Sequence, residues 1–244
     1  MRIAAVGDIH VTRDSGNFLR DLVSRAAAEA DVVALCGDLT DYGLPEEARV
    51  LADEVAAARI PVVAVLGNHD YESGAPEAVA AILRQAGASV LDGTSVEIDG
   101  VGFAGTKGFG GGFGPHALGS WGEPQIKAFV QAAADEALKL ETALSRLRMA
   151  DRVVLLHYAP IQQTVEGEPP AIFGYLGSSH LEQPIDRHRP RVAVHGHAHS
   201  GTPFGRTRGG VPVYNVSLPL LRAAAPGALF RIVDLGRLEA AADR

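Results

Sequence analysis

The sequence contains very little cysteine and no long hydrophobic run. Cys36 is the only cysteine among 244 residues, so an intrachain disulfide is excluded and a reducing environment is expected. No apolar run approaches the roughly 18 residues that a membrane span requires. The apolar stretch that precedes Asp8 is too short for a signal peptide. We therefore predict a cytoplasmic protein without a membrane partner.

Positive charge is also scarce. Lys and Arg number 22 against 29 Asp and Glu, which gives a formal net charge of −7. Proteins that grip nucleic acid usually present a basic surface, so nucleic acid is an unexpected partner. Hydrophobic residues make up 47% of the chain, as in ordinary globular proteins, and disorder is expected at most at the alanine-rich C-terminal end. Because we find no linker or internal repeat, we predict one domain over residues 1–244.

Short aliphatic runs alternate with longer helical patterns along the chain. Continuous apolar runs are typical of strands buried on both faces, and six are clear: Arg2–Val6, Asp31–Leu35, Pro61–Leu66, Arg152–Leu156, Arg191–Val194 and Val211–Val216. Apolar residues at three- and four-residue spacing, and prolines suited to a first helical turn, predict helices over Asn17–Ala30, Pro45–Ala58, Pro76–Ala86 and Pro124–Met149.

The middle of the chain has a different pattern. Two Asp-Gly pairs, at 92–93 and 99–100, separate the short apolar runs Val90–Leu91, Ser95–Ile98 and Val101–Gly105. Asp-Gly between apolar runs is a hairpin signal. Antiparallel strands are therefore expected beside the parallel units, in an α/β (α+β) fold with a mixed sheet or two packed sheets.

Side chains able to bind metal follow five of the predicted strands. They are Asp8 and His10, then Asp38 and Asp41, then Asn68, His69 and Asp70, then His157, and finally His195, His197 and His199. In open α/β sheets, ligands bind at the carboxyl ends of the parallel strands. The repetition after five strands predicts that these loops converge on one site.

The donor atoms of these residues indicate the kind of ion. Oxygen and nitrogen donors without cysteine suit Mn, Fe or Zn rather than a thiolate structural zinc. There are more candidates than one ion needs, and two ions about 3.5–4 Å apart are the usual solution for phosphate-ester hydrolysis. Glycines beside the candidates allow close approach of the backbone; these are Gly7, Gly37, Gly67 and Gly196.

Five motifs, taken in order, resemble the calcineurin-like metallophosphoesterase superfamily. They are Asp8-Ile9-His10, Gly37–Asp41, Gly67–Asp70, His157 and Gly196–His199. The resemblance implies a four-layer α/β/β/α sandwich with two mixed sheets. It also implies two divalent or mixed-valence metal ions as cofactors. The segment Gly37–Gly43 looks most similar to the bacterial branch that contains cyclic-nucleotide phosphodiesterases.

The resemblance implies a role for each site residue. The implied ligands of one ion are Asp8, His10, Asp38 and His199, and those of the other are Asp38, Asn68, His157 and His197. Asp38 would thus bridge the ions. His69 would be the catalytic histidine and would bind substrate together with Asn68, while Asp70 would hold and orient His69.

The implied activity is hydrolysis of phosphodiester or phosphomonoester bonds in a small substrate, with diesters favoured. Attack on phosphorus would be in line, by a metal-bridging hydroxide that the two cations make available near neutral pH. The alternative is a catalytically silent scaffold for protein–protein assembly. Such scaffolds usually lose part of the ligand set, whereas every candidate ligand is present here. Neither the natural substrate nor the oligomeric state is indicated.

Two residues near the predicted site, His195 and Asp41, each allow two interpretations. His195 either hydrogen-bonds a ligand or is satisfied within the core. Asp41 either hydrogen-bonds the loop backbone, in an Asx-turn, or supports a metal ligand. Three further histidines are expected at the surface: His116, His180 and His188.

Two long segments have expected roles. Thr106–Gly122 is rich in glycine and is predicted to be a mobile loop, although Lys107, Phe109 and Phe113 could border the site. The segment 158–190 lies between two metal-bearing strands, and long insertions in compact domains are often binding loops. We expect it to carry a short helix near His180–Arg187 and to shape the substrate pocket.

Overall fold

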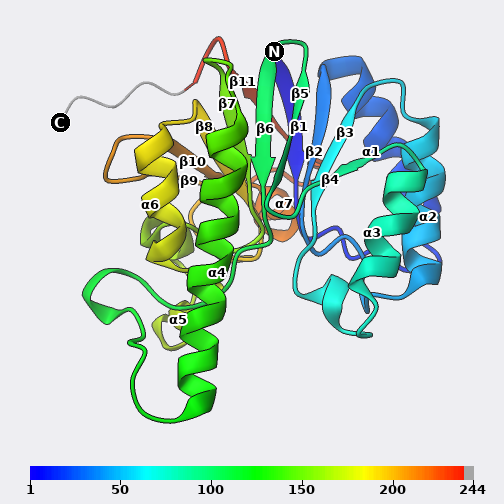
Figure 1. The fold of residues 1–244 in the computed structure, drawn as a ribbon. Coiled ribbons are helices and arrows are strands. Elements are labelled where there is room, and N and C mark those ends of the chain that lie inside the picture. Colours follow the sequence, from blue (N-terminus) through cyan, green and yellow to red (C-terminus); the bar gives the residue numbers. More distant parts are fainter. Residues whose placement is uncertain (239–244) are drawn as a thin grey trace.

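The computed structural model describes residues 1–238; the alanine-rich end, residues 239–244, lies outside this part. Two mixed β-sheets pack face to face, and helices cover both outer faces (Figure 1). The predicted α/β/β/α sandwich with two mixed sheets is confirmed. No helix among residues 1–238 is long and apolar enough to cross a membrane.

The first sheet has the strand order β11-β1-β2-β3-β4. Its strands are β1 (Arg2–Val6), β2 (Val32–Cys36), β3 (Val62–Val65), β4 (Ser89–Val90) and β11 (Arg231–Asp234). The strands β1 to β4 run parallel, and β11 is antiparallel to β1. Helices on its outer side are α1 (Gly16–Glu29), α2 (Pro45–Ala57), α3 (Pro76–Gln85) and α7 (Leu218–Ala224).

The second sheet has the strand order β5-β6-β7-β8-β10-β9. Its strands are β5 (Thr94–Ile98), β6 (Val101–Gly105), β7 (Arg152–Leu155), β8 (Val192–His195), β9 (Phe204–Arg206) and β10 (Pro212–Asn215). The four central strands are parallel, and the edge strands β5 and β9 are antiparallel to their neighbours. The long helix α4 (Pro124–Arg146) and α6 (Ser179–His188) pack on its outer face.

Alternation along each strand explains the continuous apolar runs in the sequence. In β1, Ile3 and Ala5 face the second sheet, whereas Ala4 and Val6 face the helices. Successive side chains of a strand point to opposite faces, and both faces of these strands are covered. Phe103 of β6 is completely buried between the sheets. The carboxyl ends of the parallel strands are therefore held in fixed positions.

Only one of the two predicted hairpins forms. Asp99 and Gly100 have φ values of 49° and 79°, and they close the antiparallel β5–β6 hairpin. In contrast, Asp92-Gly93 lies where the chain passes from β4 in the first sheet to β5 in the second. The hairpin predicted there is wrong, because a turn signal in the sequence does not specify which sheet the next strand joins.

Truncation of Phe103 tests the core between the sheets. Phe103→Ala should lower the free energy of unfolding by about 3–5 kcal/mol, because the cavity left by a buried aromatic ring cannot collapse completely. Urea unfolding followed by circular dichroism measures this loss. Leu138→Ala on α4, where the side chain is 65% exposed, is the control and should change the value by no more than about 0.5 kcal/mol. Equal losses in the two variants would contradict this description of the core.

Candidate metal centre

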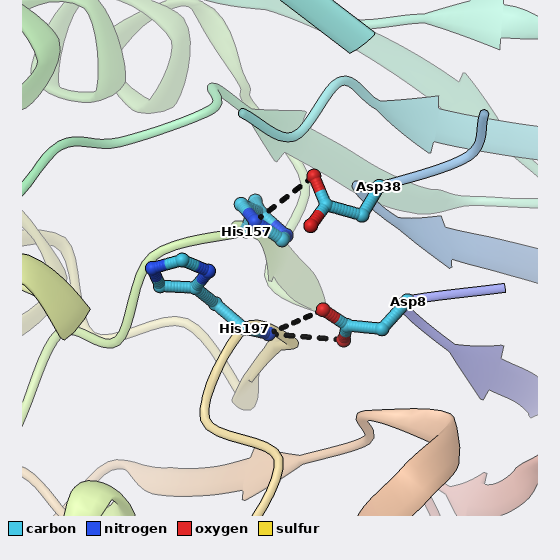
Figure 2. Close-up of side chains that lie close together, drawn as sticks. All are labelled: Asp8, Asp38, His157 and His197. Atoms are coloured by element: carbon cyan, nitrogen blue, oxygen red, sulfur yellow. Dashed lines mark hydrogen bonds and ion pairs between the residues drawn. The ribbon is translucent and has the colours of Figure 1, made fainter. Parts of the chain in front are cut away.

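Loops that follow β1, β2, β3, β7 and β8 meet at one end of the sandwich. Their side chains form three overlapping groups, and within each group the potential metal-binding atoms all lie within 4.8 Å of one another. The groups are Asp8, Asp38, His157 and His197; Asp8, His10 and His199; and His10, Asp38 and His69. Figure 2 shows the first group, with two carboxylates and two imidazole rings close together.

Asp8 links the loop after β1 with the loop after β8. Its two carboxylate oxygens accept hydrogen bonds from the backbone N–H of His197 at 3.0 and 2.9 Å (Figure 2). The Nε2 atom of His199 lies 3.1 Å from Asp8 Oδ1. Burial opposes ionisation of this carboxyl, but the hydrogen bond from His199 and the charges of His157 and His199 bring the pKa of Asp8 below its usual value.

Asp38 lies between two sets of histidines. His157 Nε2 is 3.3 Å from Asp38 Oδ1, and His10 Nε2 is 3.9 Å from Asp38 Oδ2. The backbone N–H of His69 also donates to Oδ1, at 2.9 Å. The side chain is 1% exposed, so these neighbours, rather than bulk water, make up its surroundings. Each of its oxygens thus faces a different histidine.

His157 contacts a backbone carbonyl with one ring nitrogen and faces two side-chain oxygens of the cluster with the other. Its Nδ1 lies 3.0 Å from the carbonyl oxygen of Cys36, a contact that requires the proton to be on Nδ1. The opposite atom, Nε2, is the one that faces the cluster. It faces Asn68 Oδ1 at 2.9 Å and Asp38 Oδ1 at 3.3 Å. With Nε2 unprotonated, this nitrogen and the two oxygens would together offer three ligand atoms to a metal ion. Metal-bound histidines often donate their other N–H to a backbone carbonyl, as Nδ1 does here.

His197 is oriented by a backbone carbonyl of the segment 158–190. Its Nε2 lies 3.2 Å from the carbonyl oxygen of Tyr175, in α5 (Phe173–Leu176), so Nδ1 is available to the cluster. Burial, followed by the charge of His157, lowers the pKa of His197 to about 3. The ring is therefore neutral, as a metal ligand must be.

His10 and His69 stack edge to face beside Asp41. Their ring centroids are 4.5 Å apart. His69 Nδ1 lies 2.7 Å from the carbonyl oxygen of Asp41, while a carboxylate oxygen of Asp41 lies 3.4 Å from His10 Nδ1. Of the two interpretations of Asp41, the structure favours the supporting role, because this residue contacts both rings.

Asp70 contacts the loop backbone instead of the ring of His69. It is completely buried and accepts hydrogen bonds from the backbone N–H groups of Gly67, Thr40 and Leu39 and from the Thr40 hydroxyl, at 2.6–3.2 Å. Burial raises its pKa. Asp70 thus joins the loops after β2 and β3, and the ring partner of His69 is the carbonyl of Asp41. Among residues 1–238, Asp70 makes no hydrogen bond to the ring of His69, so the predicted role of Asp70 in holding His69 would act through the loop backbone.

The backbone of the cluster is in an unusual conformation. Left-handed φ angles occur at Asp8 (57°), His10 (42°), Asp38 (48°) and His197 (68°). Such angles are uncommon outside glycine and concentrate at functional sites. The packing is equally tight: a Cβ atom on Gly196 would lie 2.3 Å from Asp8 Oδ2. The predicted need for glycine beside the candidate ligands therefore has a steric basis.

His195 is satisfied within the core. It is completely buried, its Nδ1 donates to the carbonyl of Gly196 at 2.7 Å, and its Nε2 lies 2.8 Å from the Thr164 hydroxyl. Burial lowers its pKa to about 4. Of the two interpretations of His195, the structure supports the core one, in which the ring braces the loop that carries the other two histidines.

The two long segments are bonded to each other. The backbone N–H groups of Gly111 and Gly112 donate to the carbonyls of Gly174 and Gly177, at 2.8 and 2.9 Å. Most residues between Thr106 and Phe113 are buried, whereas most of those between Gly114 and Gly122 are exposed. The segment 158–190 contains α6, close to the predicted short helix, and also the short helix α5 and two 3-10 turns, η3 (Gln162–Val165) and η4 (Pro170–Ile172).

Comparison with known proteins identifies the family. Residues 1–201 match the family model of the calcineurin-like phosphoesterases, and the chain belongs to this family. This confirms the resemblance drawn from the five motifs. No curated protein matches the sequence significantly.

Solved structures share the fold at low sequence identity. Phosphopantetheinyl hydrolase (PptH) from Mycobacterium tuberculosis is 16% identical, with a TM-score of 0.66 over 95% of both chains. A candidate 5′-nucleotidase from Staphylococcus aureus, solved in complex with α-ketoglutarate, is also 16% identical, with a TM-score of 0.53. That match covers 88% of this chain and 48% of the nucleotidase chain. At this identity the likeness establishes the fold alone.

Substitution of Gly196 tests the packing of the cluster. Gly196→Ala should weaken metal retention by roughly 10- to 100-fold, the loss typical of disturbed support around a metal ligand, because the new methyl group would displace the Asp8 carboxylate. Metal content after dialysis against a buffered chelator, measured by mass spectrometry, reports the effect. Gly16→Ala is the control, since a Cβ there meets nothing within 4 Å. Unchanged metal content in Gly196→Ala would contradict a role for Asp8 in the centre.

Proposed function

We propose that this phosphoesterase-family chain hydrolyses phosphate esters with two metal ions bound side by side. The observation that carries the proposal is the position of Asp38, whose two oxygens face different histidines. A carboxylate placed in this way is suited to bridge two cations. The convergent acceptor atoms around His157 support the same assignment.

The proposed ligands divide into two sets that share Asp38. The first set is Asp8, His10, Asp38 and His199, and the second is Asp38, Asn68, His157 and His197. The contact of His199 with Asp8 supports the first set, and the contact of Asn68 with His157 supports the second. Mn, Fe and Zn all suit these oxygen and nitrogen donors.

The residues of the chain would position the ester and balance its charge. Bound metal ions would lower the pKa of a coordinated water and polarise the phosphoryl group for in-line attack. His69 would assist the leaving group by donating a proton; its Nδ1 lies against the carbonyl of Asp41, which leaves Nε2 for the substrate. Asn68 and His69 would both contact the phosphoryl group, while Asp70 would keep their loop in place.

The favoured substrate is a small phosphodiester, with monoesters as the alternative. The basis is the resemblance of Gly37–Gly43 to the bacterial branch that contains cyclic-nucleotide phosphodiesterases. The family and the fold are compatible with either ester. The scarcity of cysteine supports a cytoplasmic location.

Removal of the proposed bridge tests the dinuclear centre. Asp38→Ala should lower the metal content of the protein. It should also reduce Mn²⁺-dependent hydrolysis of bis-p-nitrophenyl phosphate and p-nitrophenyl phosphate by more than about 100-fold. Loss of a residue that only supports a metal ligand typically costs up to about 100-fold, and loss of a bridging ligand should cost more. The rate ratio of the two esters in the unmodified protein distinguishes diesterase from monoesterase. Asp53→Ala, at an exposed position on α2, should leave metal content and rates unchanged. Full metal content in Asp38→Ala would refute the bridge.

Replacement of His69 tests proton donation. His69→Ala should keep both ions and lower kcat by roughly 10²- to 10⁴-fold, the usual contribution of general acid–base catalysis. The loss should be largest on esters with poor leaving groups, because these depend most on protonation. Rates on a series of aryl esters, with His116→Ala at an exposed position as control, measure this. An equal loss on good and poor leaving groups would exclude His69 as the proton donor.

A further inference from the structure

A cavity of about 460 Å³ opens directly beside the candidate metal centre. Asn68 lines it from the centre, and its other walls include the rings of Tyr71, Phe109 and Tyr158. The ring centroid of Tyr158 is 4.5 Å from that of His197. A molecule whose phosphoryl group lay on the cluster could therefore extend its substituent into this cavity.

Lys107 is the cationic wall of this cavity. Its Nζ lies 5.3, 4.9 and 5.0 Å from the ring centroids of Tyr71, Phe109 and Tyr158. It donates one hydrogen bond, of 2.9 Å, to the carbonyl of Gly108. An ammonium group has three donors, and within residues 1–238 Lys107 forms no ion pair. Part of its hydrogen-bonding capacity therefore remains for a ligand.

The other charged groups of the cavity are already partnered. Lys139 binds Asp92 at 2.9 Å and Glu136 at 2.8 Å. Glu136 also accepts hydrogen bonds from the Thr106 hydroxyl and the backbone N–H of Gly108, and Asp135 accepts one from Gln131. Burial lowers the pKa of Lys107, and the Glu136 carboxylate opposes this effect. Among these groups, Lys107 is the one placed to recognise an anion.

Lys107 is also anchored to the strand end that carries a proposed metal ligand. Its carbonyl accepts hydrogen bonds from the backbone N–H groups of both His157 and Tyr158, each 3.0 Å long. The lysine backbone and the His157 backbone therefore keep a fixed relation. This rigidity allows one side chain to recognise a group at a set distance from the phosphoryl position.

We propose that this cavity receives the substituent of the phosphate ester and that Lys107 selects substituents that carry a second anionic group. The aromatic walls would contact the apolar part of the substituent, and the ammonium group would bind its anion. Lys107 is thus a specificity-determining residue. The inference rests on the proposed function, because it assumes that the phosphoryl group occupies the Asp and His cluster.

Binding of a matched pair of phosphonates tests the inference without catalysis. Isothermal titration of the Mn²⁺-loaded protein should show that 4-carboxybenzylphosphonate binds roughly 10- to 100-fold more tightly than its carboxyl methyl ester, the range expected for one charge-assisted hydrogen bond. Lys107→Met should abolish this preference, and Lys107→Arg should retain much of it. Lys127→Met, at an exposed position on α4, should behave as the unmodified protein.

The possible results separate the two proposals. Equal affinity for the two phosphonates in the unmodified protein would overturn the assignment of Lys107. An equal loss of both affinities in Lys107→Met would also overturn it, because the lysine would then bind the phosphonate itself. Hydrolysis of 4-carboxyphenyl phosphate and its methyl ester, or of their methyl diesters, is measured alongside. A preference that depends on Lys107 in a protein that cleaves none of these esters would support the cavity assignment and overturn the proposed function.

Discussion

Two buried carboxylates determine how this end of the molecule is built. Asp8 and Asp38 are 2% and 1% exposed, and an ionised carboxylate removed from water needs strong compensating partners. Each obtains a backbone N–H from a different loop: Asp8 from His197 and Asp38 from His69. The bond from His197 connects the first sheet to the second. The hydrogen bonds that offset the cost of burying these carboxylates therefore also hold the loops that carry the histidines.

The same requirement explains the strained backbone. Asp8 and Asp38 lie in the short loops that follow β1 and β2, and both residues adopt a left-handed φ. Such conformations cost on the order of 1–3 kcal/mol each and persist only where the surroundings enforce them. Here the enforcement comes from strands buried on both faces and from Asp70, which binds the loops after β2 and β3. Core packing and site geometry are thus parts of one structure.

Local patterns in the sequence predicted the buried strands and the residues of the cluster, whereas the four-layer sandwich was implied by the resemblance of the five motifs to a known family. Buried parallel strands appear as continuous apolar runs, and polar residues after them identify the shared edge. Contacts made by the backbone leave no such pattern in the sequence. The ring partners of His69 and His197 are the backbone carbonyls of Asp41 and Tyr175. Because every residue type has a carbonyl, these contacts cannot be predicted from residue identity. Adjacency in the sequence also suggested a contact that is not made. Asp70 follows His69 directly, but its carboxylate accepts hydrogen bonds from residues some thirty positions away. The short β9, β11 and α7 gave too little periodicity to be predicted.

The proposed metal ligands and the proposed substrate cavity share one physical support in this fold. The segment 158–190 was expected to shape the substrate pocket, yet its Tyr175 carbonyl orients the ring of His197. Gly177 in the same segment lies so close to Ala159 that a Cβ on Gly177 would be 2.0 Å from the Ala159 carbonyl oxygen. Gly177 also bonds to Gly112 in the glycine-rich segment that begins beside Lys107. A rearrangement of this segment would therefore move a proposed metal ligand and a cavity wall together, so that changes in ester preference would be accompanied by changes in metal affinity.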